Sequence, residues 1–469
     1  MQLAPILLAY RPGVDELPGA AGSAADPHTD RLMTGEFTGA GERAPGARAP
    51  RVRRWPARWA SRRLFPLLAS AILILAGMVT TTLIEPQALG TTAWSLPDDL
   101  WGTLLAAQRL LHLNLGGLYT QPTGLITFPG AAVILVPIVA VGEAAGLSLS
   151  PQGPNNPQPA LWLLAGPYMI AISSVALFAA DALAERLAVS RARRAFLTAA
   201  GATLLWSVSV EWGHPEDAVA LGLALYAILA LSDARPARSA WLTGLAIAVQ
   251  PLVILMVPVV LATLEARKLA GFLARAAAPA AVVLGVAAAA NWSATYHAVT
   301  SQPNWPLVDH PTPWTPLAPH LAGGAIAGGP LRVVAILLAC GCGLILRRRL
   351  NAAQRPVRWA HGTLRELLWW AALALALRSV FETVMVAYYL WPALAVALIA
   401  AARSWRRLIL SSCFAVAVSL GAQSSWRSPW GWWSLMVAGL ALTLFLAGFP
   451  GRRVRVNWQA GSRSPPRLT

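Results

Sequence analysis

The sequence predicts an all-α protein, a bundle of helices that crosses a lipid bilayer many times. Three observations predict this fold class. Hydrophobic residues make up 56% of the chain and charged residues only 12%, and the mean hydropathy is +0.55, which is typical of polytopic membrane proteins. Apolar runs of about 20 residues, the length of one crossing, recur along the chain. Between these runs the arginines gather in short segments, as they do in loops on one side of a membrane.

The positive charge indicates membrane topology rather than a nucleic-acid partner. The net charge is +17, and Lys268 is the only lysine. In a soluble protein such an excess would suggest nucleic acid, but here the arginines flank apolar runs, so we exclude nucleic acid. A basic block over 43–63 precedes the first run, 64–84, and predicts a cytoplasmic N-terminus. A secondary role in binding anionic lipid heads fits the same block, but topology alone explains it.

Three regions are expected along the chain. Residues 1–54 lack apolar periodicity and should form a disordered, basic cytoplasmic segment. Residues 55–449 should form one membrane domain, and 450–469 a cytoplasmic tail.

The segment 85–123 should lie outside the membrane on the opposite side. Within it, DDLWGTLLAAQRLLHLNL has helical spacing, with Asp98 and Asp99 at its start. We expect an amphipathic helix in the outer interface. The two aspartates fit either a capping role or a chemical one, and the two roles can coexist.

Two apolar runs should be broken or re-entrant. The run 124–142 carries Pro129 and Pro137, and the run 240–263 is interrupted at Gln250-Pro251. If both runs crossed fully, the arginine clusters after them would lie on the wrong side. Irregular backbone at membrane depth is tolerated where it lines a cavity or protein interior, so both breaks point to a cavity.

The remaining runs complete the bundle without conflict. An outer loop rich in Pro and Trp is expected over 292–329. With the two broken elements, the count is about ten full spans plus two partial ones. The full spans are expected near 64–84, 160–181, 195–212, 217–232, 276–291, 330–346, 366–385, 388–402, 408–423 and 430–449.

The junction at 211–217 is the strongest candidate for a functional site. Glu211, His214, Glu216 and Asp217 crowd a turn that Gly213 and Pro215 impose between two apolar runs. Ionisable groups at a membrane boundary are usually functional, although a polar hairpin that only faces water fits the same residues. Carboxylates beside an imidazole suit general-base work on a hydroxyl group, and they also offer ligands for a divalent cation.

A second candidate cluster lies late in the chain. Arg378 and Glu382 are four residues apart on one helix face, and Tyr388 and Tyr389 follow. The pair could be an ion pair that only neutralises itself. Alternatively, Arg378 binds a phosphate, which its planar fork matches, and Glu382 orients the arginine. The tyrosines fit an interfacial belt or a surface that stacks on sugar rings.

Taken together, these features resemble the GT-C superfamily of integral membrane glycosyltransferases, more narrowly the actinobacterial polyprenol-phosphate-dependent mannosyltransferases and arabinofuranosyltransferases. Four features carry the resemblance: the aspartates of the first outer loop (98–99), the polar turn (213–217), a glycine-led run with an internal proline (244–251) and the Tyr-Tyr-x-Trp-Pro stretch (388–392). It covers roughly 64–449 as a loose pattern. Relatives usually have Lys-Pro where this chain has Gln250-Pro251, which puts donor binding in doubt.

The resemblance implies a sugar donor on a polyprenyl phosphate and a glycan or glycolipid acceptor at the outer face of the cytoplasmic membrane. Asp98 or Asp99 would deprotonate the acceptor hydroxyl, and Arg378 would steady the leaving phosphate. Such enzymes are often metal-independent, so no cofactor is assigned, and a divalent cation stays open. The alternatives are a transporter or flippase of a lipid-linked intermediate, or an inactive scaffold with the same fold. All of them depend on whether 98–99 and 214–217 converge on one pocket.

Overall fold

The computed structural model describes residues 60–84, 98–120, 125, 127–147, 149, 159–304, 310–328, 331–352, 359–423 and 428–448. All of them belong to one compact unit, Trp55–Thr469. The expectations for 1–54 and 450–469 therefore lie outside the described residues, as does the outer segment 85–97.

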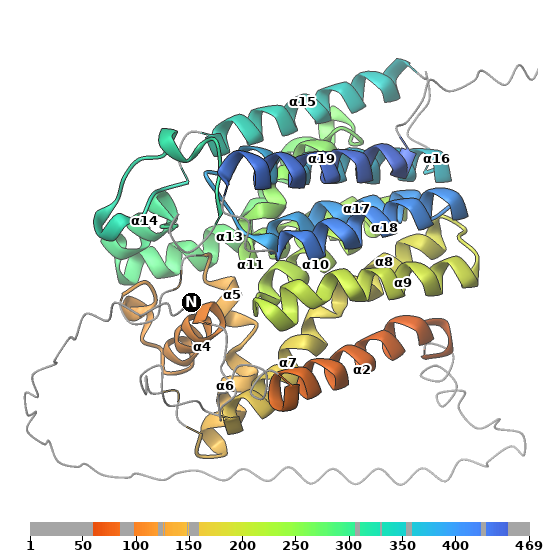
Figure 1. Cartoon of the computed structure of the whole chain (residues 1–469). Helices are drawn as coiled ribbons and strands as arrows, with labels where there is room; N and C mark the ends of the chain where they lie inside the picture. Colours follow the sequence, from red (N-terminus) through yellow and green to blue (C-terminus); the bar gives the residue numbers. More distant parts are fainter. Residues whose placement is uncertain are drawn as a thin grey trace, which may run out of the picture. The chain divides into compact units, whose positions relative to one another are not determined.

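The described residues are mainly helical, with one short two-stranded sheet (Figure 1). The strands β1 (His310–Pro311) and β2 (Val384–Met385) pair antiparallel. The α-helices are α2 (Leu64–Val79), α4 (Asp98–Leu111), α5 (Gly130–Val133), α6 (Val136–Ala144), α7 (Pro159–Ser173), α8 (Val175–Arg186), α9 (Arg191–Trp206), α10 (Pro215–Ser232), α11 (Pro236–Val249), α12 (Val257–Leu261), α13 (Ala266–Ala290), α14 (Trp292–Ser301), α15 (Leu331–Ala352), α16 (His361–Phe381), α17 (Trp391–Ala401), α18 (Trp405–Ala422) and α19 (Pro429–Gly448).

Six helices in the described part of the chain are long and apolar enough to cross a membrane, which makes this a membrane-embedded helical protein. They are Leu64–Leu83, Leu161–Arg186, Pro215–Ser232, Ala266–Ala290, Trp405–Ala422 and Trp430–Gly448. The finer prediction of about ten full spans is not confirmed. Helices α9 and α17 have only 16 and 11 residues, and α15 and α16 carry arginines within their apolar runs.

Helix α10 lies inside the bundle and packs against α7, α8 and α11. Its sequence, PEDAVALGLALYAILALS, is apolar on every face after the first turn, so all sides of the helix can be buried. Pro215 opens it at a position where a missing N–H costs nothing. Glu216 and Asp217 occupy the first turn, where the helix dipole favours negative charge.

At the opposite end of the bundle from Glu216, arginines bind the carbonyl groups that end several helices. Arg365 donates to Gly448 O at 2.8 Å and to Ala400 O at 3.2 Å, and Arg193 donates to Arg403 O. Cations suit the C-terminal end of a helix dipole. The arginines that set the predicted topology therefore also satisfy backbone groups that α17 and α19 leave unpaired.

The run 240–263 enters and leaves the bundle by the same end. Helix α11 stops at Gln250, a 3-10 turn follows over Pro251–Met256, and α12 turns back. Arg347, at the arginine-rich end of α15, donates to Leu264 O at 3.1 Å. Gln250 instead reaches Asp217 in the first turn of α10. The break at Gln250-Pro251 thus brings a polar side chain to the acidic end of the bundle.

The run 124–142 is also broken, into α5 and α6. Glu143, near the end of α6, accepts hydrogen bonds from Gln108 at 2.8 Å and contacts His112 at 2.9 Å, both in or just after α4. Helices α4, α5 and α6 lie together in Figure 1 (orange). The segment therefore starts beside the end of α11 and finishes beside α4.

Gly130 is required by the close approach of α5 to the end of α11. A β-carbon at this position would overlap the carbonyl group of Ala248. We predict that Gly130→Ala lowers the unfolding free energy by about 1–3 kcal/mol, the usual cost of overpacking, as measured by thermal melting in detergent. Gly285→Ala on α13, where nothing lies within 4 Å, is the control and should melt at or slightly above the wild-type temperature. Equal melting of both variants would contradict the close packing.

Candidate active site

The turn between α9 and α10 places His214, Glu216 and Asp217 at one end of the bundle. Helix α9 ends in a π-helical turn, Ser207–Glu211, and Gly213 follows with a φ of 65°, a conformation that glycine adopts without strain. The amide of His214 donates to Val208 O at 2.9 Å. This tight turn directs the His214 ring inward, and π-turns of this kind are frequent at functional sites.

His214 lies between two carboxylates that come from distant parts of the chain. Its Nδ1 is 2.7 Å from Glu216 Oε1, and its Nε2 is 3.1 Å from Asp99 Oδ2. A neutral imidazole has only one N–H, so the ring can donate to both carboxylates only when it is protonated. The side chains of His214 and Glu216 are buried, whereas that of Asp99 is 57% exposed. Of these three hydrogen-bonded residues, Asp99 is therefore the one that a bound molecule can reach.

The two carboxylates keep His214 charged. Burial alone would disfavour the imidazolium, but the charges and hydrogen bonds of Glu216 and Asp99 outweigh it and raise the pKa of His214 to about 10. In return, the hydrogen bond from His214 lowers the pKa of Asp99, against the opposing effect of burial. Asp99 is consequently an ionised carboxylate at neutral pH.

The raised pKa of His214 predicts a defined pH dependence of stability. A pKa raised on folding contributes stability that is fully present below the unfolded value of 6.5 and disappears as pH rises to about 10. The difference in melting temperature between the wild type and His214→Asn should therefore be largest at pH 6.5 and shrink steadily towards pH 10. Melting curves across that range test this, and a difference that does not change with pH would show that His214 is neutral in the folded protein.

Two tyrosines cover the charged groups of the site. The Tyr388 ring stacks on His214 with a centroid distance of 4.1 Å. The guanidinium of Arg378 lies 3.8 Å from the centroid of Tyr389. Both contacts place a cation against an aromatic face, which is attractive when the groups are desolvated. One face of each tyrosine is thus occupied by the protein itself, which leaves less ring surface for stacking on a sugar.

Arg378 and Glu382 belong to a larger cluster than the sequence indicated. Glu382 is buried and lies between two arginines, at 3.0 Å from Arg332 Nε and 3.5 Å from Arg378 Nε. Arg332 also donates to Gln302. Two guanidiniums around one carboxylate carry a net positive charge. The guanidiniums therefore outnumber the carboxylate between them, and their N–H groups are donors of the kind that suit an anion.

Asp217 lies behind the polar chamber, inside the first turn of α10. Gln250 Nε2 donates to its Oδ1, while its Oδ2 is buried without a hydrogen-bond partner among the described residues. Gln250 Oε1 also accepts from Thr127 at 3.4 Å. Gln250 thus satisfies one oxygen of a buried acid and links α11 to α10.

These groups line two cavities that meet. A polar chamber of about 70 Å³ adjoins a cavity of about 270 Å³ whose walls are mainly apolar. The residues that line both are Gln250, Gln302, Arg332 and Arg378. The chamber is completed by Asp99, Thr103, Thr127, His214, Glu216, Asn304, Tyr388 and Tyr389. The larger cavity is completed by Phe128, Pro251, Leu252, Ile254, Leu255, Val299, Ala335, Ile336, Phe381 and Glu382. The two arginines therefore stand where the polar and apolar spaces join.

The structure brings together most of the residues singled out in the sequence. Asp99, His214, Glu216, Arg378, Tyr388 and Tyr389 line the polar chamber, and Glu382 lines the cavity beside it. Asp98 is the first residue of α4, but its side chain lies outside the described part. Glu211 is exposed and does not line either cavity.

Several site residues escaped the sequence analysis. Arg332 lies just inside the apolar run 330–346, which the sequence predicts to be a span. An arginine within such a run is itself an indication of a functional site. Gln302 and Asn304 lie in the long outer loop, and Thr103 and Thr127 carry no pattern that would mark them. Their positions depend on how the loop folds back, which periodicity does not reveal.

Within the described residues, no three His, Cys, Asp or Glu side chains are arranged to hold a metal ion. No family model matches this chain, and comparison with curated proteins gives no match.

Proposed function

We propose that the protein is a glycosyltransferase that moves a sugar from a polyprenyl phosphate to a cell-envelope glycan or glycolipid. The observation that supports this best is the junction of the two cavities, where Arg332 and Arg378 separate an apolar space from a polar chamber containing Asp99. A polyprenyl-phosphate sugar has the same three parts in the same order: an apolar chain, an anionic phosphate and a polar sugar. Apolar walls with a few convergent polar groups are typical of a ligand site.

In the proposed reaction, Asp99 is the general base. Its ionised carboxylate takes the proton from an acceptor hydroxyl as the hydroxyl oxygen forms a bond to the anomeric carbon of the donor. His214 and Glu216 fix one carboxylate oxygen, Oδ2. The other, Oδ1, has no protein partner among the described residues and faces the acceptor. Attack from the face opposite the phosphate inverts the configuration at the anomeric carbon.

The leaving group is polyprenyl phosphate. The bond between the anomeric carbon and the phosphate oxygen breaks, and the electron pair stays on that oxygen, so negative charge grows on the phosphate. Arg332 and Arg378 would bind it through charge-assisted hydrogen bonds. Glu382 holds both guanidiniums at the junction. The net positive charge of these three residues would stabilise the negative charge that grows on the departing phosphate.

The protein would have a defined orientation in the cytoplasmic membrane. The arginine-rich end of the bundle would face the cytoplasm, with both termini on that side, and the site would open at the outer face. About ten full spans and two re-entrant elements, as in GT-C enzymes, complete the proposed topology.

The direct test uses purified protein in vesicles with a synthetic polyprenyl-phosphate mannose or arabinofuranose and a short oligosaccharide acceptor. We expect the elongated oligosaccharide and polyprenyl phosphate to appear in equal amounts. Movement of the donor between leaflets without either product would favour a flippase instead. Neither product nor movement with any donor would favour an inactive scaffold.

A further inference from the structure

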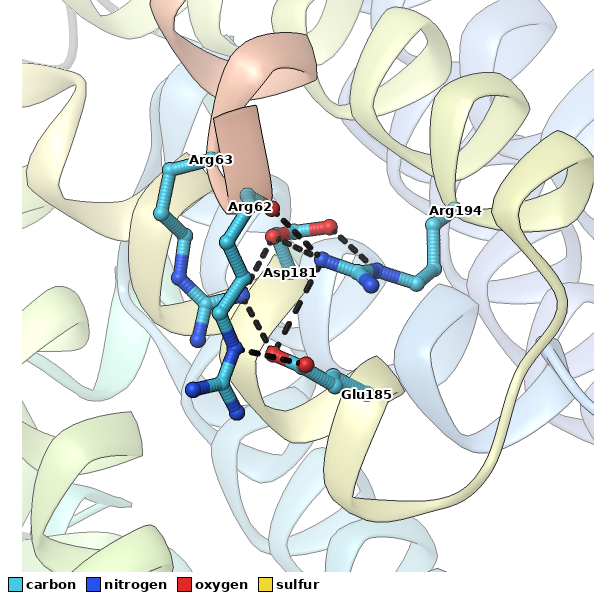
Figure 2. A network of polar contacts seen from close by, with 5 residues as sticks. All are labelled: Arg62, Arg63, Asp181, Glu185 and Arg194. Carbon is cyan, nitrogen blue, oxygen red and sulfur yellow. Dashed lines mark hydrogen bonds and ion pairs between the residues drawn. The ribbon is translucent and has the colours of Figure 1, made fainter. Parts of the chain in front are cut away.

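The arginine-rich end of the bundle holds a buried ionic network that plays no part in the site described above. Arg63 Nη1 lies 2.7 Å from Asp181 Oδ2 and 2.8 Å from Glu185 Oε2. Arg194 makes two hydrogen bonds to Asp181, at 2.6 and 2.7 Å. Figure 2 shows Asp181 between the arginines, with Arg194 on one side and Arg63 on the other. The network ties the start of α2 to α8 and α9.

This network is not electrically balanced. Arg62, Arg63 and Arg194 carry three positive charges, and Asp181 and Glu185 carry two negative ones. Arg62 is 62% exposed and uses only Nε for Glu185, at 2.7 Å. Its two terminal nitrogens have no partner in the part of the chain that the structure describes. One positive charge is thus available at the surface, with free donors.

An apolar groove of about 560 Å³ opens on the bundle surface between α6, α7, α8 and α10. Its walls include Tyr168, Ala171, Val175, Phe178, Leu223 and Tyr226. They belong to two of the candidate membrane spans, Leu161–Arg186 and Pro215–Ser232. The groove therefore lies at the depth of acyl chains, and an apolar chain is the occupant that this depth supplies.

The groove leads to the ionic network. Phe178, Asp181 and Glu185 are spaced i, i+3 and i+7 along α8, so they share one face of that helix. Phe178 lines the groove, and Asp181 belongs to the ionic network. An apolar groove that ends at an unbalanced cationic cluster is complementary in shape and charge to an anionic membrane phospholipid.

We propose that this groove and network bind an anionic phospholipid of the leaflet at the arginine-rich end. The headgroup phosphate would contact Arg62 and Arg63, and one acyl chain would occupy the groove. The groove favours a phospholipid over free phosphate, because a free ion would not occupy an apolar groove.

The test measures how much lipid raises the melting temperature of the protein in detergent. Titration with phosphatidylglycerol should give a saturable increase, whereas phosphatidylcholine with the same acyl chains should give a much smaller one. Inorganic phosphate should have no effect. Arg62→Gln should weaken the apparent affinity for phosphatidylglycerol about fivefold, the contribution of one arginine near a membrane surface. Each variant is compared with its own lipid-free melting temperature, so a general loss of stability does not count.

Two further variants distinguish binding of the lipid headgroup from binding of the acyl chain. Ala171→Trp would fill the groove from an exposed position without changing any charge, and it should also weaken binding. Arg406→Gln removes an exposed arginine from the same end of the bundle, on α18, and should bind lipid as the wild type does. The proposal is overturned if the two lipids stabilise equally, if phosphate alone reproduces the effect, if Ala171→Trp binds normally, or if Arg406→Gln loses as much as Arg62→Gln.

Discussion

Replacing Asp99 with asparagine should slow glycosyl transfer by at least about 100-fold, the lower bound for losing a general base. Asparagine has nearly the same shape, and its side-chain oxygen can still accept the hydrogen bond from His214. What it cannot do at neutral pH is take a proton from the acceptor. The rate of product formation at saturating donor and acceptor measures the loss, and thermal melting checks that the variant is folded.

Glu211→Gln is the matched control for this experiment, because Glu211 is an acid of the same outer region that is exposed and outside both cavities. It should transfer sugar at the wild-type rate. Asp98→Asn is the informative comparison. If Asp98→Asn abolishes transfer and Asp99→Asn does not, the base is the neighbouring residue. If neither variant is impaired, the protein has no carboxylate base at the start of α4.

Removal of Arg378 should have the second large effect. Arg378→Gln takes away one of two guanidiniums at the junction of the cavities, and the loss of one donor to developing charge typically slows a reaction about 100- to 1,000-fold. Glu382 would keep Arg332 as its partner at 3.0 Å, so the buried acid is not left unpaired. Arg332→Lys should retain only part of the wild-type rate, because lysine supplies charge but not the planar fork.

Arg349→Gln provides the control for the arginines. Arg349 pairs with Glu366 at 2.9 Å, and its exposure, 31%, nearly equals the 30% of Arg332, but it lies at the opposite end of the bundle. Its replacement should leave the rate and the binding of polyprenyl phosphate unchanged. If Arg378→Gln and Arg332→Gln both bind polyprenyl phosphate as tightly as the wild type, the junction is not the phosphate site.

Sequence patterns predicted the membrane class and the meeting of the two acidic segments. Ionisable residues are rare in apolar chains, so Asp99 and His214 could be recognised as a site without knowledge of packing. The structure brings them into contact at 3.1 Å across 115 positions of the chain. The interruption at Gln250-Pro251 was likewise visible, because a polar residue before a proline breaks an apolar run.

The rest of the site depends on packing that a one-dimensional pattern does not encode. Arg332 lies within a predicted span and is not recognisable from the sequence pattern as a partner of Glu382, although its guanidinium completes the cluster around that residue. The tyrosines fit either an interfacial belt or a sugar-stacking surface in the sequence, and the pattern did not reveal that each covers a cation with one ring face. The six long apolar helices in the described part of the chain do not confirm the ten predicted full spans. Hydropathy alone does not separate a full crossing from a shorter apolar helix.

The most direct measurement is an experimental structure of the protein with bound polyprenyl phosphate. We predict that the phosphate will be found in hydrogen-bond contact with Arg332 and Arg378, the isoprenoid chain along Leu252, Leu255 and Ile336, and Asp99 facing the open side of the polar chamber. A phosphate bound elsewhere, or a lipid chain that leaves the larger cavity empty, would contradict the assignment of this site.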